Sequence, residues 1–138
     1  MYEIYIDGSS RGNPGPSGIG VIAFKENKRI FSYREFIGIK TNNQAEYESL
    51  RRALEMCSKL DKELTIFSDS ELLVNQRNSK YKLRNQELKV ISRDISILEK
   101  NFEKILYKHV PREKNGKADK LANRALNEHI KKNMELAK

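Results

Sequence analysis

Four acidic residues, Asp7, Glu46, Asp69 and Asp119, stand at positions that side-chain packing alone does not explain. Asp7 and Asp69 each end a short run of β-forming residues, and in open α/β sheets ligands bind at the carboxyl ends of strands. Glu46 and Asp119 border the apolar stripes of two expected helices, where an inward-pointing carboxylate is costly unless a cation compensates it. We therefore expect two strand-end acids and two helical acids to converge beside a sheet.

Converging carboxylates without histidine or cysteine ligands select hard cations such as Mg²⁺ or Mn²⁺. Four carboxylates cannot all ionise together without positive charge between them, and two metal ions would supply that charge. Such a pair activates water on one side of a phosphodiester and stabilises the leaving oxygen on the other. The pattern therefore favours a metal-dependent nuclease.

Each acid also has a simpler explanation when it is taken alone. Asp69 could be a helix N-cap, and Asp7 could begin an Asx turn before a glycine. Glu46 could interact with the helix dipole, and Asp119 could pair with a neighbouring lysine. These structural alternatives remain open for each residue, but they do not explain why four acids share this placement.

The elements that must position these acids follow the order β-β-β-α-β-α-α-β-α. Turn-forming residues separate three β-rich runs near the N-terminus, and apolar residues at helical spacing mark the helices. The expected strands are residues 2–7, 18–25, 29–39, 63–68 and 103–110, and the expected helices are 42–60, 69–76, 86–100 and 117–127. Thr41 or Asn42 can cap the first helix, and Ser68 or Asp69 the second. Strands that follow one another directly should pair antiparallel, and strands joined by helices should pair parallel.

The 138 residues suffice for one domain, which we expect to span residues 1–127, followed by a basic tail at 128–138 that either extends the last helix or frays. No apolar run approaches the roughly 20 residues of a membrane span, so no membrane partner is expected. The single cysteine, Cys57, cannot form an internal disulfide, which fits a reducing cytoplasm. We expect a monomer.

The positive charge lies in the second half of the chain. Residues 1–76 carry ten Lys/Arg and eleven Asp/Glu, a net charge of −1, whereas residues 77–138 carry seventeen and eight, a net charge of +9. A polyanion such as nucleic acid is a natural partner for this half. A solvated, lysine-rich surface that aids solubility is the simpler alternative.

Four blocks that contain the acids resemble the type 1 ribonuclease H family, and they occur in the family's order across residues 2–126. The blocks read YIDGS with GNPGPSGIG, TNNQAEY, IFSDS with VNQ, and VPREKN followed by Ala118-Asp119 and Leu121-Ala122. The resemblance implies a mixed five-stranded sheet, with three antiparallel strands and then two parallel ones, flanked by helices. It implies endonucleolytic cleavage of the RNA strand of RNA–DNA hybrids, leaving 5′-phosphate and 3′-hydroxyl ends.

The resemblance also assigns roles to individual residues. It makes Asp7, Glu46, Asp69 and Asp119 the ligands of two Mg²⁺ or Mn²⁺ ions in the substrate complex. Short amides can donate and accept hydrogen bonds in the wide minor groove of a hybrid, which displays 2′-hydroxyls. The expected substrate-binding residues are Asn13, Asn42, Asn43, Gln76, Lys82, Arg84, Arg112 and Asn115. Helix capping is an alternative role for Asn42 and Asn43.

Two departures from the family pattern point to its archaeal-like branch. The stretch from residue 77 to 86 is too short for the extra basic helix and loop of many bacterial members. Either Lys80, Tyr81, Lys82 and Arg84 take over part of that contact, or they are plain surface residues. Arg112 and Glu113 stand where the Gly-His of the family's catalytic loop is usual, and Arg112 could contact a phosphate. His109 precedes the loop and more simply belongs to the strand. Whether the protein also cleaves double-stranded RNA stays an open question.

Two other functions compete with hybrid cleavage. A nucleic-acid-binding domain that kept the fold and lost catalysis would be missing an acid, and all four acids are present. A related nuclease or recombinase acting on DNA would share the metal site, but the amides at residues 13, 42 and 43 favour reading of 2′-hydroxyls.

Overall fold

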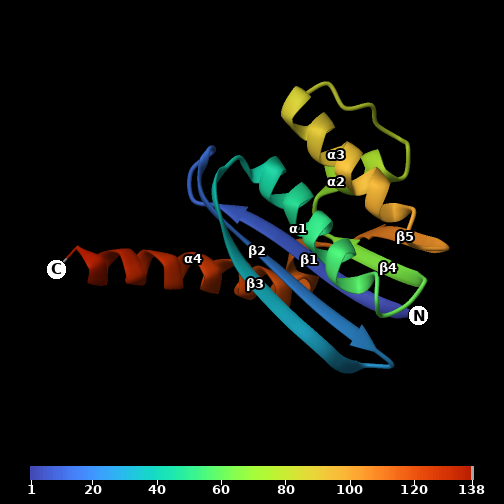
Figure 1. The fold of residues 1–138 in the computed structure, drawn as a ribbon, viewed down its shortest axis with the longest axis horizontal. Helices are drawn as coiled ribbons and strands as arrows, with labels where there is room; N and C mark the ends of the chain where they lie inside the picture. Colours follow the sequence, from blue (N-terminus) through green and yellow to red (C-terminus); the bar gives the residue numbers. More distant parts are fainter. Residues whose placement is uncertain (138) are drawn as a thin grey trace.

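The computed structural model of the chain describes residues 1–137; Lys138, the last residue of the expected tail, lies outside them. Nine helices and strands and one 3-10 turn make up the described part (Figure 1). They are β1 (Tyr2–Ser10), β2 (Gly15–Lys25), β3 (Lys28–Lys40), α1 (Asn42–Cys57), β4 (Glu63–Ser68), α2 (Glu71–Arg77), α3 (Gln86–Glu99), β5 (Lys104–His109), the 3-10 turn η1 (Arg112–Lys114) and α4 (Gly116–Leu136).

The five strands form one mixed sheet in the order β3-β2-β1-β4-β5. Strand β2 pairs antiparallel with both β1 and β3, whereas β4 pairs parallel with both β1 and β5. The expected sheet of three antiparallel strands followed by two parallel strands is therefore confirmed. The carboxyl ends of β1 and β4 lie next to each other, as parallel pairing requires.

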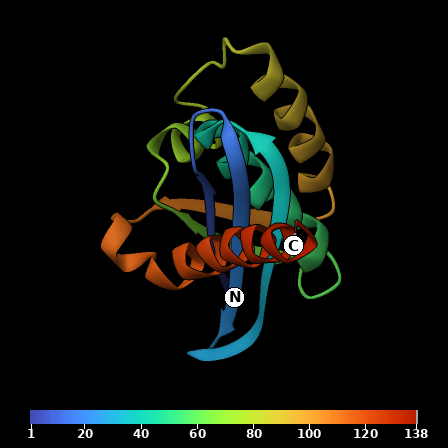
Figure 2. The ribbon, with the colours of Figure 1, turned by 90° about the vertical axis from the view of Figure 1, so that its left-hand side faces the viewer.

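Alternation along β1 and β2 directs side chains to two covered faces. Ile4, Ile6 and Val21 belong to a large core beneath α1 and α3, and each fully buried aliphatic side chain there contributes roughly 1.5–3 kcal/mol. On the other face, Ile22 packs against Leu121 of α4 in a smaller cluster. The sheet is thus a central layer with helices on both sides, as the two views show (Figures 1 and 2).

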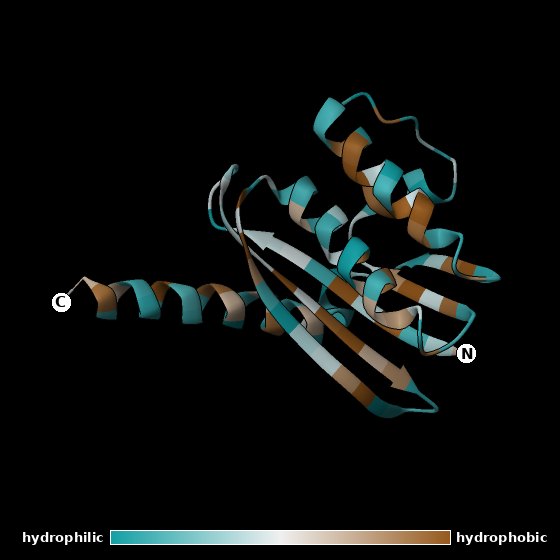
Figure 3. Ribbon diagram, in the orientation of Figure 1, coloured by the Kyte–Doolittle hydropathy of each residue, from teal (hydrophilic) through white to brown (hydrophobic). Residues whose placement is uncertain are grey.

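Most element boundaries differ by a few residues from the sequence-based expectation, and two of these differences change an expectation about the chain. Helix α2 begins at Glu71 with Ser70 as its cap, so the expected cap at Ser68 or Asp69 is wrong; the Ser70 side chain accepts from the backbone N–H of Leu73. Helix α4 continues to Leu136, so residues 128–136 extend it rather than fray. Its last turns project beyond the sheet and carry alternating polar and apolar residues (Figure 3).

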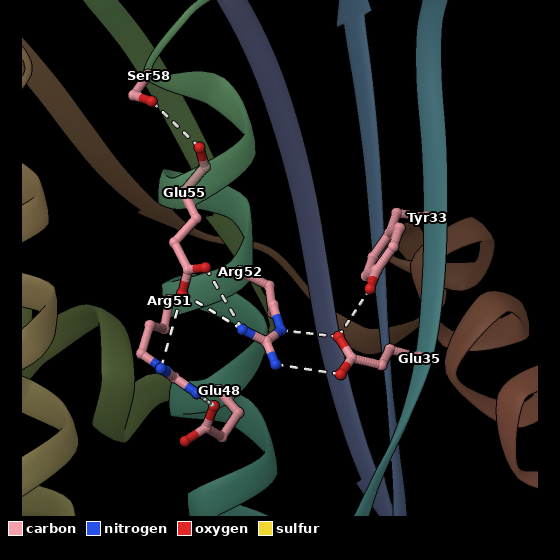
Figure 4. A network of polar contacts seen from close by, with 7 residues as sticks. All are labelled: Tyr33, Glu35, Glu48, Arg51, Arg52, Glu55 and Ser58. Atoms are coloured by element: carbon pink, nitrogen blue, oxygen red, sulfur yellow. Dashed lines mark hydrogen bonds and ion pairs between the residues drawn. The ribbon is translucent and has the colours of Figure 1, made fainter.

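A polar network fixes α1 against the edge strand β3 (Figure 4). Arg52 donates to both carboxylate oxygens of Glu35, at 2.7 and 3.1 Å, and the Tyr33 hydroxyl donates to the same carboxylate at 2.8 Å. Because both charged side chains are partly exposed, the ion pair contributes only about 1 kcal/mol or less. Its two-point geometry nevertheless orients the helix that carries Glu46. Within residues 1–137, no helix combines the length and the apolar character that a bilayer crossing requires.

Candidate active site

Because Gly8 has no side chain, the backbone of α1 can cross β1 in direct contact with the strand backbone. A Cβ atom at Gly8 would lie 2.2 Å from the carbonyl carbon of Ala45 and 2.6 Å from the nitrogen of Glu46. The close crossing lets the backbone N–H of Gly8 donate to Oε1 of Glu46 at 2.5 Å. The buried Glu46 carboxylate is therefore held directly beside Asp7, the preceding residue of β1.

A second close crossing brings Asp119 to the same strand end from the opposite face. A Cβ atom at Gly20, which pairs with Asp7 across β1 and β2, would lie 2.2 Å from the carbonyl oxygen of Ala118. Helix α4 therefore sits against the sheet one residue before Asp119. The Nδ2 group of Asn123 donates to the Asp119 backbone oxygen at 3.0 Å and to Oδ1 at 3.3 Å, which orients the carboxylate.

Asp69 follows the last residue of β4, and Asn115 orients its side chain. The Nδ2 group of Asn115 donates to Oδ2 of Asp69 at 3.3 Å and to the backbone oxygen of Ile6 at 2.8 Å. Asn115 is only 1% exposed, so the expected contact of this residue with substrate is wrong, because the side chain is buried between β1 and β4. His109 ends β5, as expected, and its Nε2 lies 3.2 Å from the backbone oxygen of Asp69.

Three of the four acids form one compact cluster. Ligand oxygens of Asp7, Glu46 and Asp69 all lie within 4.8 Å of one another, a spacing that suits a divalent cation. Asp119 is outside this group of three, but its carboxyl lies within hydrogen-bonding reach of Asp7. The structure thus brings the four expected acids to one end of β1, with Asp119 on the α4 side.

Full ionisation of these carboxyl groups would place more negative charge in the cluster than its surroundings compensate. Burial, together with the nearby charges of Asp69 and Asp119, raises the pKa of the Asp7 carboxyl from 3.8 to about 8. Burial and the same kind of repulsion, from Asp7 and Asp69, raise the pKa of Glu46 well above its ordinary value. An all-oxygen donor set with this excess of charge is compatible with divalent metal binding.

The raised pKa of Asp7 predicts how stability depends on pH without metal. The folded protein keeps this proton to about pH 8, whereas the unfolded chain loses it near pH 3.8. Stability is therefore lost progressively as pH rises through this window. Asp7→Asn should raise the free energy of unfolding by about 1–3 kcal/mol at pH 8 and change it little at pH 4. Urea unfolding in a chelator at both pH values measures this difference.

The control for that experiment is Asp94→Asn, which removes an exposed acid of α3 and should leave stability unchanged at both pH values. Added Mg²⁺ should stabilise the wild type more than Asp7→Asn, because the ion removes the repulsion that the substitution already relieves. An Asp7→Asn protein that is destabilised equally at pH 4 and pH 8 would contradict the inference that ionised Asp7 adds uncompensated negative charge to the cluster.

The polar residues expected to contact substrate surround this cluster to different degrees. Asn13 lies in the turn after β1 and Asn42 and Asn43 begin α1, where the Asn13 Oδ1 accepts from the backbone N–H of Asn42 at 3.0 Å. All three side chains are exposed. Gln76 is half-buried near the end of α2. The cap of α1 is Thr41, so Asn42 and Asn43 are not needed for capping.

The basic residues of interest lie on two exposed segments. Lys82 and Arg84 lie in the loop of residues 78–85 that joins α2 directly to α3. Arg112 lies in the exposed turn η1, three residues before Asn115. The structure brings none of these three side chains into a contact with the four acids.

Three residues of this region were not singled out from the sequence. Asn123 follows Asp119 by four residues, a helical spacing that could have revealed it. In the sequence Gly8 belongs to a turn signal, and its role in the site depends on how closely α1 approaches β1. Tyr47 has the sequence environment of an ordinary core residue, and no local sequence pattern links it to the acidic cluster.

Comparison with known proteins supports the same family. A family described as reverse transcriptase-like matches residues 5–125. The solved structure of LC11-RNase H1 in complex with an RNA/DNA hybrid has a TM-score of 0.90 at 38% identity, covering 94% of this chain and 99% of that one. The RNase H1 of the halophilic archaeon Halobacterium salinarum has a TM-score of 0.89 at 33% identity, covering 92% and 98%.

Curated relatives support the same family assignment, although several of them are longer proteins. A bifunctional protein of Mycobacterium tuberculosis is 36% identical over 126 residues, which are 89% of this chain and 35% of that protein. The chain thus spans about a third of the length of the first curated relatives it matches. With the mixed sheet and the acidic cluster, these matches show that the chain belongs to the reverse transcriptase-like family and to the type 1 ribonucleases H that it resembles in sequence and fold.

Proposed function

We propose that this chain cleaves the RNA strand of RNA–DNA hybrids endonucleolytically, leaving 5′-phosphate and 3′-hydroxyl ends. The observation that carries the proposal is the cluster of Asp7, Glu46 and Asp69, whose oxygens lie within 4.8 Å of one another beside Asp119. A family relative, LC11-RNase H1, has been solved in complex with an RNA/DNA hybrid, which supports the choice of substrate.

The four carboxylates would hold two Mg²⁺ or Mn²⁺ ions when substrate is bound. Such ions supply an activated water and stabilise charge on the leaving oxygen. The protein's own contribution is positioning: Gly8 N–H holds Glu46, Asn115 holds Asp69, and Asn123 holds Asp119. These three carboxylates therefore keep a fixed orientation, which limits the reorganisation needed when charge develops on the scissile phosphate.

Substrate choice in this proposal depends on the 2′-hydroxyl. In this proposal the amides of Asn13, Asn42, Asn43 and Gln76 bind a minor groove lined by 2′-hydroxyls, and the exposure of the three asparagines supports that role. A double-stranded DNA substrate offers no such groups, which disfavours the alternative of a DNA nuclease. Arg112 is proposed as a phosphate contact, since a guanidinium cannot exchange protons at neutral pH. The buried single thiol of Cys57 is compatible with a cytoplasmic monomer.

Exposed basic residues of the 78–85 loop are proposed to hold the nucleic-acid backbone. Replacing Lys80, Lys82 and Arg84 by serine should weaken hybrid binding about tenfold or more at low salt and reduce the slope of log Kd against log salt by about 1–3. Fluorescence anisotropy with a labelled hybrid measures both quantities.

A matched control removes three exposed lysines outside the 78–85 loop, Lys28 at the start of β3 and Lys59 and Lys62 between α1 and β4. This variant loses the same net charge but should keep the wild-type salt slope. If both triple variants lose the same affinity and slope, the loop has no specific part in binding and the effect is one of net charge.

One cleavage assay tests the proposed function. The protein is incubated with labelled RNA–DNA hybrid, double-stranded RNA and double-stranded DNA of one sequence, with Mg²⁺ or with Mn²⁺. We expect cleavage of the hybrid and intact double-stranded DNA. An uncut hybrid with either ion contradicts the proposal, and the double-stranded RNA lane decides whether that substrate is also cut.

A further inference from the structure

Helix α4 leaves part of one sheet face uncovered. It touches the sheet at Gly18 and Gly20, where a Cβ atom would lie 2.5 Å from the Ala122 carbonyl oxygen and 2.2 Å from that of Ala118. Beyond these glycines, the tip of the β2–β3 hairpin extends past the helix (Figure 2). Two adjoining hollows of 480 and 630 Å³ lie between helix and hairpin, within the roughly 300–1,000 Å³ of pockets that hold organic ligands. Together they are called the α4 groove, and four residues line both hollows: Phe24, Asn27, Lys117 and Lys120.

Basic side chains line both walls of the larger hollow: Lys117, Lys120 and Arg124 from α4, and Arg29 and Arg34 from β3. The three residues of α4 are spaced i, i+3 and i+7, so they form one stripe along the helix. Arg34 pairs with the exposed Glu128. In the described part of the chain, Arg29, Lys117 and Lys120 form no ion pair.

The charge of the α4 groove is therefore positive and partly unpaired. Two acids, Glu3 and Glu113, line the smaller hollow, against six basic residues that line the two hollows together: Arg29, Arg34, Lys114, Lys117, Lys120 and Arg124. By contrast, three arginines of α1 and α2 each pair with a glutamate: Arg51, Arg52 and Arg77. Positive charge that is gathered in a hollow without protein partners favours a polyanionic ligand.

Aromatic rings form the floor of the groove. Tyr5 and Phe24 both line it, and their ring centroids lie 6.0 Å apart in an edge-to-face arrangement. Phe67 stacks on Tyr5 with a centroid distance of 4.7 Å, and the Nζ atom of Lys117 lies 5.0 Å from the Phe24 centroid. All three aromatic side chains are only partly buried. Aromatic rings beside cations are the features with which proteins bind single strands, because unpaired bases stack on the rings.

We propose that the α4 groove binds single-stranded nucleic acid. Arg29, Lys117 and Lys120 contact the phosphates, and the rings of Tyr5 and Phe24 stack on bases. A duplex keeps its base faces inside its own stack, so it would leave the aromatic floor unused, and an acidic peptide would match only the charge. The groove lies on the sheet face opposite α1, away from the amides and the basic loop proposed to hold the hybrid. This second site goes beyond the proposed function and does not depend on it.

Anisotropy in a chelator tests base stacking without cleavage. The labelled probes are oligothymidylate and oligouridylate of about twelve nucleotides and an abasic DNA strand of the same length, which keeps the phosphates and lacks bases. The two strands with bases should bind within about threefold of each other, and the abasic strand about tenfold more weakly. Phe24→Leu keeps an apolar side chain and removes the ring. It should weaken oligothymidylate binding about fivefold or more and change abasic binding less than about twofold.

A triple variant tests the cations, which are exposed and can be changed without disturbing the core. Replacing Arg29, Lys117 and Lys120 by glutamine should reduce the slope of log Kd against log salt for oligothymidylate by about 2, since each phosphate contact on a single strand contributes about 0.7. The matched control replaces three exposed lysines outside the groove by glutamine and should keep the wild-type slope: Lys59, Lys62 and Lys100. Hybrid affinity should fall no further in the groove variant than in the control.

The outcomes separate this inference from the proposed function. Equal affinity for oligothymidylate and the abasic strand, or a Phe24→Leu variant that weakens both alike, overturns base stacking. Equal salt slopes in the groove and control variants overturn the site itself. A polyglutamate peptide that binds as tightly as oligothymidylate overturns the assignment to nucleic acid and makes the groove a peptide site. Failure to cut the hybrid would contradict only the proposed reaction, because every test here measures binding.

Discussion

Replacing Asp69 by asparagine is expected to reduce hybrid cleavage by about a thousandfold or more while changing hybrid affinity less than about threefold. The substitution keeps the shape of the side chain and the contact with the Asn115 amide, but it removes one of the three clustered carboxylates. Because the cluster acts on the reacting phosphate and the exposed amides and basic loop hold the duplex, the loss should fall on kcat. Single-turnover cleavage and anisotropy with one labelled hybrid measure the two effects separately.

The control for Asp69→Asn is Asp94→Asn, which neutralises an exposed acid on α3 and should leave both cleavage and affinity unchanged. Near-normal cleavage by Asp69→Asn would show that this carboxylate is not required for the reaction. A loss of affinity as large as the loss of cleavage would instead give Asp69 a role in holding substrate.

The second large effect is expected at Gly8. In Gly8→Ala, the new Cβ atom would lie 2.2 Å from the Ala45 carbonyl carbon, so α1 must move away from β1. We expect a loss of about 3 kcal/mol in the free energy of unfolding, because the obstruction is backbone and cannot rotate aside. The same movement separates Glu46 from the Gly8 N–H, so cleavage should fall about a hundredfold even where the protein is folded. Urea unfolding and kinetics at low temperature measure both.

Gly116→Ala is the matched control, because a Cβ atom at Gly116 meets no atom within 4 Å and the residue begins α4. That substitution should be neutral or stabilise the protein by up to about 1 kcal/mol, through reduced freedom of the unfolded chain. A Gly8→Ala protein as stable and active as Gly116→Ala would rule out the close crossing of α1 and β1.

The order of elements and the mixed sheet could be predicted because both depend on local patterns. Strand β4 was placed at its observed bounds, since β-forming residues and flanking polar residues mark both ends. The convergence of Asp7 and Asp69 follows from the rule that parallel neighbours end at one edge of a sheet. The resemblance to ribonuclease H then assigned the two helical acids, Glu46 and Asp119, to the same set of metal ligands as Asp7 and Asp69.

What the sequence could not reveal depends on distances between segments far apart in the chain. The two-residue difference at the start of α2 leaves the Asp69 carboxylate free of a capping bond, because Ser70 caps the helix. Asn115 was expected to bind substrate, yet it is buried and its amide donates to the backbone oxygen of Ile6, 109 positions away in the sequence. The contact of Tyr47 with Gln76 joins α1 to α2 across 29 positions of sequence, which no local pattern encodes.

The most direct test of the central claim is the identity of the cut strand and of its ends. A hybrid labelled separately on its RNA and its DNA strand is incubated with the protein and Mg²⁺ or Mn²⁺, and the products are mapped and their termini identified. We predict that only the RNA strand is cut and that its fragments carry 5′-phosphate and 3′-hydroxyl ends, since activated water attacks the phosphodiester. Cleavage of the DNA strand, or RNA fragments ending in a 2′,3′-cyclic phosphate, would contradict hydrolysis at the carboxylate cluster.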